Sequence, residues 1–515
     1  MKVLLAMALL VFGAVSAKAE WHRAESENFI IYADDRASDV EEFATMLERF
    51  HAALALLTRR DLPPPSPSNR LTIFVVGKQR AIGRLVGDRN VAGFYTARAS
   101  GSFAFVPDVN IGRRELDFSM IVLLHEYVHH FTIASARFTM PRWMSEGSAE
   151  FFSSAQFGAD GSVKIGMPAN HRGWELAGNR DVPIEKLLDM SRFETDEGIG
   201  NFYGRSWALY HMLFFSETRA GQLVDYTRRI ASGDDALDAA RQAFGDLEEL
   251  DLELDRYLKL RRMSAITVNA AAISTGPVRV EKMSEGMAAM LPVIIRSKFG
   301  VDAEKAADVL KDARSTAVEY PDDSGVLAAL AEAEYDAGND QAAIEAADAA
   351  LARDEATTNA YVQKGYALFR QATEAQGADR KAAFAAAMAP FRQLNRLEQD
   401  HPLPLIYYYR SLIESGQDVN ETARHALERA SELAPFDHSL AINVALMQAG
   451  EGKIALAMNG LAPVAANPHG GDASVFARAF VSELEKWEEG KPYLFAKAGF
   501  LTDFSAHEDG DKIRN

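Results

Sequence analysis

The sequence contains no cysteine among its 515 residues. This absence excludes a disulfide framework and a lipid-attachment cysteine. Basic residues are also few, because 55 lysines and arginines stand against 73 aspartates and glutamates, which gives a net charge of −18. Such a surface repels phosphate backbones and anionic membranes, so neither nucleic acid nor a bilayer is an expected partner.

Long apolar runs are absent after the first residues, which excludes membrane spans in the rest of the chain. At the start, an apolar run at residues 3–15 follows a lysine and precedes small residues that end in Ala-Lys-Ala. This pattern predicts a secretory signal peptide at residues 1–19. An amphipathic first helix is the alternative, but the run has no polar face. We therefore expect a periplasmic or secreted protein without a lipid anchor or membrane insertion.

Hydrophobic periodicity predicts two domains. Residues 20–265 form an α+β domain in which strand patterns and helix patterns alternate. The strand patterns lie at 28–32, 71–76 and 102–106, and the helix patterns at 38–57, 116–133 and 143–156. After a linker at 266–283, alanine becomes frequent and strand patterns disappear.

Residues 284–490 are predicted to form helical hairpins, followed by a polar tail at 491–515. Small residues in Leu327–Glu355 match the 34-residue spacing of tetratricopeptide repeats, in which two antiparallel helices pack closely. Further copies begin at Tyr361 and near Leu405. A solenoid of this kind presents a surface that binds peptides or proteins.

The motif with the most specific chemistry is His125-Glu126-Tyr127-Val128-His129, within a predicted helix. Residues at i and i+4 share one helix face, so both imidazoles can reach one Zn²⁺ at about 2.1 Å. Glu126 is the neighbour that can take a proton from a water on the metal. Two histidines capping a buried helix are the alternative interpretation.

A catalytic zinc ion takes three protein ligands and keeps one position open. A metzincin would have a glycine and a third histidine downstream, but Thr132 and Ser135 occupy those positions. The next carboxylates are Glu146 and Glu150, on a second predicted helix. Their positions alone do not decide which of them is the third ligand.

His125-Glu-Tyr-Val-His129 and Trp143-Met-Ser-Glu146-Gly-Ser-Ala-Glu150 resemble the motifs of the gluzincin metallopeptidases. This clan includes the thermolysin-like and aminopeptidase families, and bacterial exported proteins with a peptidase-like domain before tetratricopeptide repeats are particularly similar. The resemblance covers residues 119–213 and implies a thermolysin/aminopeptidase-like fold for the first domain. It implies that Glu146 is the third zinc ligand. It also implies that Glu150 orients a ligand histidine, His125, and fixes its tautomer.

The segment Phe202-Tyr203-Gly-Arg-Ser-Trp207 is similar to the Tyr-x-Lys-Gly segment of the aminopeptidase branch. The resemblance implies that Tyr203 donates a hydrogen bond to the oxyanion of the tetrahedral intermediate. An aromatic side chain on an amphipathic helix face is the alternative. His211, on the same predicted helix, could contact substrate, although a lone histidine in an apolar helix is more often structural.

In this clan an edge strand upstream of the zinc helix pairs with the extended peptide substrate. Gly101–Val106 lies at that place in the sequence, so the residues expected to bind substrate are Ser102, Phe103, Ala104 and Phe105. An ordinary strand inside the sheet is the alternative. The Gly-x-Met-x-Asn motif that binds a free amino terminus is missing, so amino-terminal specificity is not implied.

Together these features predict an exported metallopeptidase with one Zn²⁺ per chain, whose repeats recruit substrate or a protein partner. Two other hypotheses remain. In the first, the peptidase-like domain is catalytically silent and the repeats are a protein-binding scaffold. In the second, the zinc centre hydrolyses a non-peptide bond in the cell envelope, because fold does not decide substrate.

Overall fold

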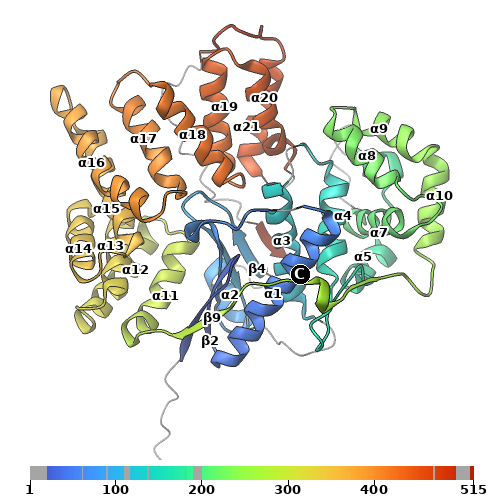
Figure 1. Cartoon of the computed structure of the whole chain (residues 1–515), viewed down its shortest axis with the longest axis horizontal. Helices are drawn as coiled ribbons and strands as arrows, with labels where there is room; N and C mark the ends of the chain where they lie inside the picture. Colours follow the sequence, from blue (N-terminus) through green and yellow to red (C-terminus); the bar gives the residue numbers. More distant parts are fainter. Residues whose placement is uncertain are drawn as a thin grey trace, which may run out of the picture.

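The structure is a computed structural model of the chain. It describes residues 20–60, 62–87, 91–108, 116–135, 138–179, 181–189, 200–467, 470–494, 501 and 511–514. The predicted signal peptide, residues 1–19, lies outside these residues. Figure 1 shows a central sheet and its helices, with the later helices curving along one side and across the top.

A seven-stranded mixed sheet forms the centre of the first domain, in the order β10-β4-β5-β3-β2-β1-β9. The strands are β1 (Trp21–Glu25), β2 (Phe29–Asp34), β3 (Leu71–Val75), β4 (Val91–Thr96), β5 (Ser102–Val106), β9 (Arg279–Lys282) and β10 (Asp511–Arg514). β2, β3 and β5 run parallel, and the other pairs are antiparallel. The strand patterns at 28–32, 71–76 and 102–106 correspond to the three parallel strands.

Helices cover both faces of the sheet because its side chains alternate between two cores. On one face, α1 (Ala37–Thr58) and α3 (Phe118–Ser135) pack on side chains such as Ile73 and Ala104. On the other face, α2 (Gln79–Val86) and α11 (Glu285–Phe299) pack on side chains such as Phe74 and Phe105. The first repeat helix, α11, is thus part of the sheet's second core.

A helical layer after α3 completes the first domain. It contains α4 (Arg142–Ser153), α5 (Gly173–Gly178), α6 (Ile184–Leu188), α7 (Phe202–Phe215), α8 (Gln222–Ala231), α9 (Ala236–Phe244) and α10 (Leu247–Tyr257), with 3₁₀ turns η1 (Pro67–Asn69), η2 (Asn170–Arg172) and η5 (Ala270–Ala272) elsewhere in the domain. A small sheet of β6 (Gln156–Phe157), β7 (Val163–Ile165) and β8 (Ile266–Val268) lies beside it. Gly147 lets α4 approach α7, because a Cβ there would lie 2.5 Å from the carbonyl oxygen of Ser206.

The repeats form paired antiparallel helices, which confirms the predicted all-α region. The described helices after α11 are α12 (Ala303–Glu319), α13 (Ser324–Asp336), α14 (Asp340–Arg353), α15 (Thr358–Glu374), α16 (Ala378–Leu397), α17 (Pro402–Glu414), α18 (Glu421–Leu433), α19 (His438–Gly450), α20 (Ile454–Ala466) and α21 (Gly471–Leu484). Alanines fill the contacts between paired helices, as Ala331 and Ala347 do with no exposed surface. The small volume of these side chains sets the close helix spacing.

Two predicted segment boundaries differ from the structure. The expected linker, residues 266–283, supplies β8 to the small sheet and β9 to one end of the large sheet. The expected polar tail, residues 491–515, contributes β10, which pairs with β4. Strand pairing with distant partners decides both cases, and neither segment has a distinct hydrophobic pattern of its own.

The repeats dock on the first domain through the turn between β4 and β5. The backbone N–H of Ala99 donates to Asp437 Oδ2 at 2.8 Å, and Ala99 is buried among repeat side chains. Phe436 stacks on His130 of α3, with ring centroids 4.8 Å apart. Asn69 Nδ2 donates to the carbonyl oxygen of Leu433 at 2.9 Å. The repeats therefore hold a fixed position against the helix that carries the zinc motif.

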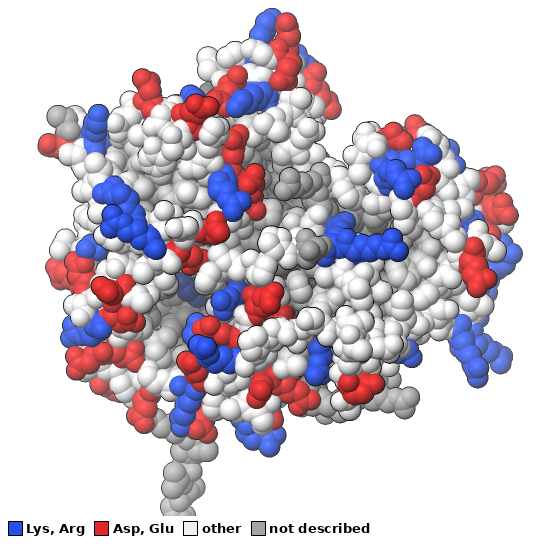
Figure 2. Space-filling model, viewed as in Figure 1, with Lys and Arg blue, Asp and Glu red and all other residues white. Residues whose placement is uncertain are grey.

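The surface mixes charges of both signs. Figure 2 shows acidic and basic side chains interspersed over this face, and its outline is hollowed between the α19–α21 and α8–α10 lobes that Figure 1 labels. Among the described residues, no helix has both the length and the apolar character required to cross a membrane.

Candidate metal centre

The zinc motif lies on α3, and the helix positions both imidazoles toward α4. His125 Nε2 and His129 Nε2 are 3.1 Å apart, and each lies 3.4 Å from Glu146 Oε2. The Glu146 side chain has no exposed surface, and each imidazole retains 12% of its surface. Among the described residues, these three form the one group of His and carboxylate side chains arranged to hold a metal ion.

The spacing of the three atoms fits a zinc ion. Tetrahedral ligands at about 2.1 Å from a common centre are separated from one another by about 3.4 Å. The three observed separations are 3.1, 3.4 and 3.4 Å. Two imidazole nitrogens and one carboxylate oxygen are the donor set of catalytic zinc sites that keep one position open. The residues present therefore fit Zn²⁺.

The outer nitrogen of each histidine is also held. His125 Nδ1 lies 3.2 Å from Glu150 Oε1, and His129 Nδ1 lies 3.3 Å from Ser145 Oγ. A carboxylate on the outer nitrogen fixes which ring nitrogen carries the proton, and so leaves Nε2 as the metal ligand. The structure thus places Glu150 where the resemblance implied, and it assigns Glu146 and Glu150 to different sides of His125.

Glu150 is itself anchored by two residues that the sequence did not suggest. His171 Nε2 lies 2.6 Å from Glu150 Oε2, and Arg172 donates to Oε1 from Nε at 3.0 Å and from Nη2 at 2.5 Å. Both come from the short turn η2, which has no sequence pattern that indicates such a role. Burial alone would raise the pKa of Glu150, but Arg172 and the two histidines outweigh it and hold the pKa well below the usual range.

The same contacts set the charge of His125. Burial alone would lower its pKa, but the hydrogen bonds that its ring donates to Glu146 and Glu150 outweigh burial and raise the pKa to about 10. Metal ions bind only the neutral imidazole, so a metal ion and a proton compete for His125 Nε2. Glu126, beside His125 on α3, is buried with 7% of its surface exposed, and its charge also raises the pKa of His125.

Tyr203 lies in the first turn of α7, close enough to this centre for the charge of Glu146 to act on it. The Arg172 guanidinium lies 4.7 Å from the centre of its ring, and Arg142 hydrogen-bonds its side chain. Burial first, and then the charge of Glu146, raise the pKa of the phenol above its usual range. The hydroxyl therefore stays protonated near neutral pH and can donate a hydrogen bond. The helix contact at Gly147 is what brings α7, and with it Tyr203, against α4.

Two predicted substrate contacts are wrong. β5, which carries Ser102, Phe103, Ala104 and Phe105, pairs with β3 on one side and β4 on the other, so its backbone is not an edge for a peptide. His211 has no exposed surface. Its ring contacts the Tyr257 hydroxyl at 2.6 Å and the carbonyl oxygen of Gly166 at 2.9 Å, so the structural role given as the alternative is correct.

A second group of histidines, each half-buried, supports the back of α3. His130 Nδ1 lies 2.6 Å from the Tyr95 hydroxyl on β4, and His51 Nδ1 lies 2.6 Å from the Tyr127 hydroxyl. Burial lowers the pKa of His130 to about 4, so this ring stays neutral. These contacts fix α3 between α1 and β4, and with it the orientation of the zinc motif.

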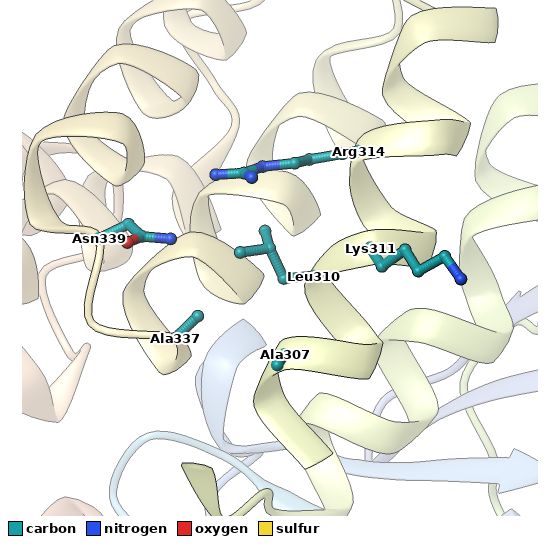
Figure 3. A pocket seen from close by; sticks show the side chains of 6 residues that line it. All are labelled: Ala307, Leu310, Lys311, Arg314, Ala337 and Asn339. Atoms are coloured by element: carbon teal, nitrogen blue, oxygen red, sulfur yellow. The ribbon is translucent and has the colours of Figure 1, made fainter. Parts of the chain in front are cut away.

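The repeats contain a pocket that is separate from the metal centre. Its volume is about 510 Å³, and it lies between α12 and the turn after α13 (Figure 3). The side chains that line it are Ala307, Leu310, Lys311, Arg314, Ala337 and Asn339. None of them belongs to the metal-centre region, so the pocket has no part in that chemistry.

Comparisons with known proteins give one family match and several solved structures that are distantly similar. Residues 120–234, which contain the metal centre and Tyr203, match a family described as a protein of unknown function, DUF1570. No curated protein matches the chain. Similar solved structures include a thermophilic TPR protein of Thermus thermophilus, at 16% identity and a TM-score of 0.33, which covers 38% of this chain and 97% of its own.

Two further structures are similar at the same level. The MamA protein is 16% identical, with a TM-score of 0.25, and the match covers 42% of this chain and 100% of that one. Yeast Tom70 is 12% identical, with a TM-score of 0.28, and the match covers 71% of this chain and 72% of that one. Similarities at this level do not identify a function for the chain.

Proposed function

We propose that the protein is an exported zinc-dependent metallopeptidase of the gluzincin type. One observation carries the proposal: His125 Nε2, His129 Nε2 and Glu146 Oε2 face one another at 3.1–3.4 Å, with the outer nitrogen of His125 held by Glu150. If the two histidines only capped a helix, there would be no reason for a buried carboxylate at each nitrogen of the His125 ring. The ligands of the proposed zinc are these three residues.

A zinc ion held there would polarise the scissile carbonyl and lower the pKa of a water towards about 7. Glu126, buried on the same helix turn as the ligands, accepts the proton of that water as the general base and passes it to the leaving amine. Tyr203, kept protonated by burial, donates to the oxyanion. Arg172 connects the two parts of the site, since it binds Glu150 and lies over the Tyr203 ring.

The experiment compares zinc-loaded wild-type protein with Glu126→Gln on a mixture of unstructured peptides. We expect about one zinc per chain in both proteins, and turnover that falls by about 10²- to 10⁴-fold in the variant, the usual contribution of a general base. Full activity in Glu126→Gln would contradict the assignment. A folded wild-type protein that binds no zinc would favour the silent platform, in which the repeats alone are functional.

A zinc hydrolase of envelope amides is the second candidate, because the metal centre itself does not discriminate between amide bonds. The same pair of proteins tested on envelope fragments would separate the two substrates. For both candidates we propose that the repeats hold the catalytic half in place and offer a protein-binding surface, and that the mature protein is periplasmic or secreted.

A further inference from the structure

The outer edge of β4 is covered by the last described strand of the chain. β10 pairs antiparallel with β4, with residue 511 opposite Tyr95, 512 opposite Phe94 and 513 opposite Gly93. On its other side β4 pairs with β5. In Figure 1 this strand, coloured dark red, lies beside β4 and close to α3. Without residues 511–514, β4 would be the edge strand of the sheet.

This edge lies beside the helix that carries the zinc motif. The Tyr95 hydroxyl on β4 contacts His130 Nδ1 at 2.6 Å, and His130 follows the ligand His129 on α3. A chain segment paired with β4 therefore lies at the sheet edge, next to the strand on which α3 packs. The strand that the sequence indicated for substrate, β5, is one position further into the sheet, and β4 is the antiparallel strand on the open side.

The repeats bind the chain at Leu501, upstream of the covering strand. Asn443 of α19 binds both backbone groups of Leu501: its Nδ2 donates to the carbonyl oxygen at 2.9 Å, and its Oδ1 accepts from the N–H at 2.8 Å. The residue just before α19, Asp437, binds the turn that ends β4. The repeats thus contact both the turn that follows β4 and Leu501, upstream of β10.

We propose that residues 511–514 occupy the β4 edge as an internal competitor, and that an extended peptide must displace them to pair with β4. Strand pairing of this kind is made by backbone groups, so peptides of many different sequences can take the place of residues 511–514 on β4. A segment tethered within the same chain also acts at a high effective concentration. The catalytic consequence rests on the proposed function, whereas the strand exchange itself does not.

The first test weakens β10 in the full chain with the double substitution Lys512→Pro and Ile513→Pro. Successive N–H groups of a strand point to opposite sides, so one of the two substitutions removes a donor that faces β4. The matched control, Lys512→Ala with Ile513→Ala, keeps both donors. Hydrogen exchange of residues 91–96 should be at least about tenfold faster in the proline variant, because the edge amides lose protection, and unchanged in the alanine variant. Equal exchange in the two variants would overturn the proposal.

The second test adds a labelled synthetic peptide of residues 505–515 and measures its binding by fluorescence anisotropy. If β10 fills the edge in nine chains of ten, the peptide should bind the proline variant about tenfold more tightly than the alanine variant. For peptide hydrolysis, the proline variant should have a KM lower than that of the alanine variant by the same factor, and the same kcat. Equal affinities, or equal KM values in proteins that hydrolyse peptides, would contradict the proposal.

The two proposals fail in different ways. If no variant hydrolyses any peptide, the proposed function fails, while hydrogen exchange and peptide binding still decide whether β10 competes for the edge. If hydrolysis occurs and depends on Glu126, but KM, peptide binding and exchange are the same in both variants, the competitor role fails and the proposed function stands.

Discussion

The helices around the metal centre and the helices of the repeats are packed with different residues. α3, α4 and α7 bury large aromatic side chains such as Trp143 and Phe151 together with charged ones such as Glu146 and Glu150. The paired repeat helices instead meet through alanine, and residues such as Ala347 have no exposed surface. The first region depends on the chemical identity of its buried groups, since each must find a partner. The second depends mainly on their small volume.

The largest expected effect concerns the two buried carboxylates of α4, which have different roles at equal burial. Glu146→Gln removes one of the three proposed zinc ligands, so we expect a zinc-loaded protein to lose the metal on dialysis. Glu150→Gln leaves all three ligands and only weakens the hold on His125, which should weaken zinc affinity about 10- to 100-fold. Elemental analysis and competition with a chelator measure both. If Glu150→Gln weakened zinc binding more than Glu146→Gln, the roles assigned to the two carboxylates would be reversed.

Gly147→Ala tests how closely the first region is packed. The added methyl group would lie 2.5 Å from the backbone carbonyl of Ser206, which cannot rotate away, so α4 and α7 must separate. We expect a loss of about 1–3 kcal/mol in unfolding free energy, measured by urea denaturation. Gly173→Ala in α5 is the control, because nothing lies within 4 Å of its added Cβ. If Gly147→Ala changed the unfolding free energy no more than Gly173→Ala, the contact between α4 and α7 would not be tight.

Ala347→Leu is the corresponding change in the repeats. Its side chain is fully buried between paired helices, so three extra carbons should cost about 1–3 kcal/mol through overpacking. Zinc content should not change, which separates this variant from Gly147→Ala. Ala307→Leu on an exposed position of α12 is the control. If Ala347→Leu unfolded at the same urea concentration as the control, volume would not be what constrains this region.

Sequence periodicity predicted the parts of the structure that depend on local pattern. His125, Glu126 and His129 share one helix because their spacing fits one turn, and the resemblance placed Glu146. Strand order was not predictable, since β5 is an inner strand only because β4 and β3 pair with it from elsewhere in the chain. His171 and Arg172 were missed because a partner of a buried charge can come from any turn.

Asp336, a half-buried carboxyl at the end of α13 in the repeats, should make the stability of the protein depend on pH. Burial first, and then the nearby Glu332, raise the pKa of Asp336 to about 7. Because the folded pKa lies above the unfolded value of about 3.9, the folded state binds the proton more tightly. Stability from this group is fully present below pH 4 and is lost as the pH rises towards 7. Asp336→Asn should therefore raise the Tm at pH 8 and leave it nearly unchanged at pH 4. An equal shift at both pH values would contradict the raised pKa.

The smallest expected effect tests the contact between the two regions. Asp437 accepts from the backbone N–H of Leu440 at the start of α19 and also from that of Ala99. Asp302 caps α12 in the same way, by accepting from Lys305, but has no contact of this kind with the first domain. Removal of either cap should cost about 1 kcal/mol.

Asp437→Ala should cost about 1 kcal/mol more than Asp302→Ala, because a buried backbone donor loses its charged partner as well. Urea denaturation of the two variants measures this difference. Hydrogen exchange of residues 97–101 should accelerate in Asp437→Ala alone, since the turn is released from the repeats. If the two variants lost equal stability and the turn kept its protection, the apolar contacts around Phe436 would be what joins the regions.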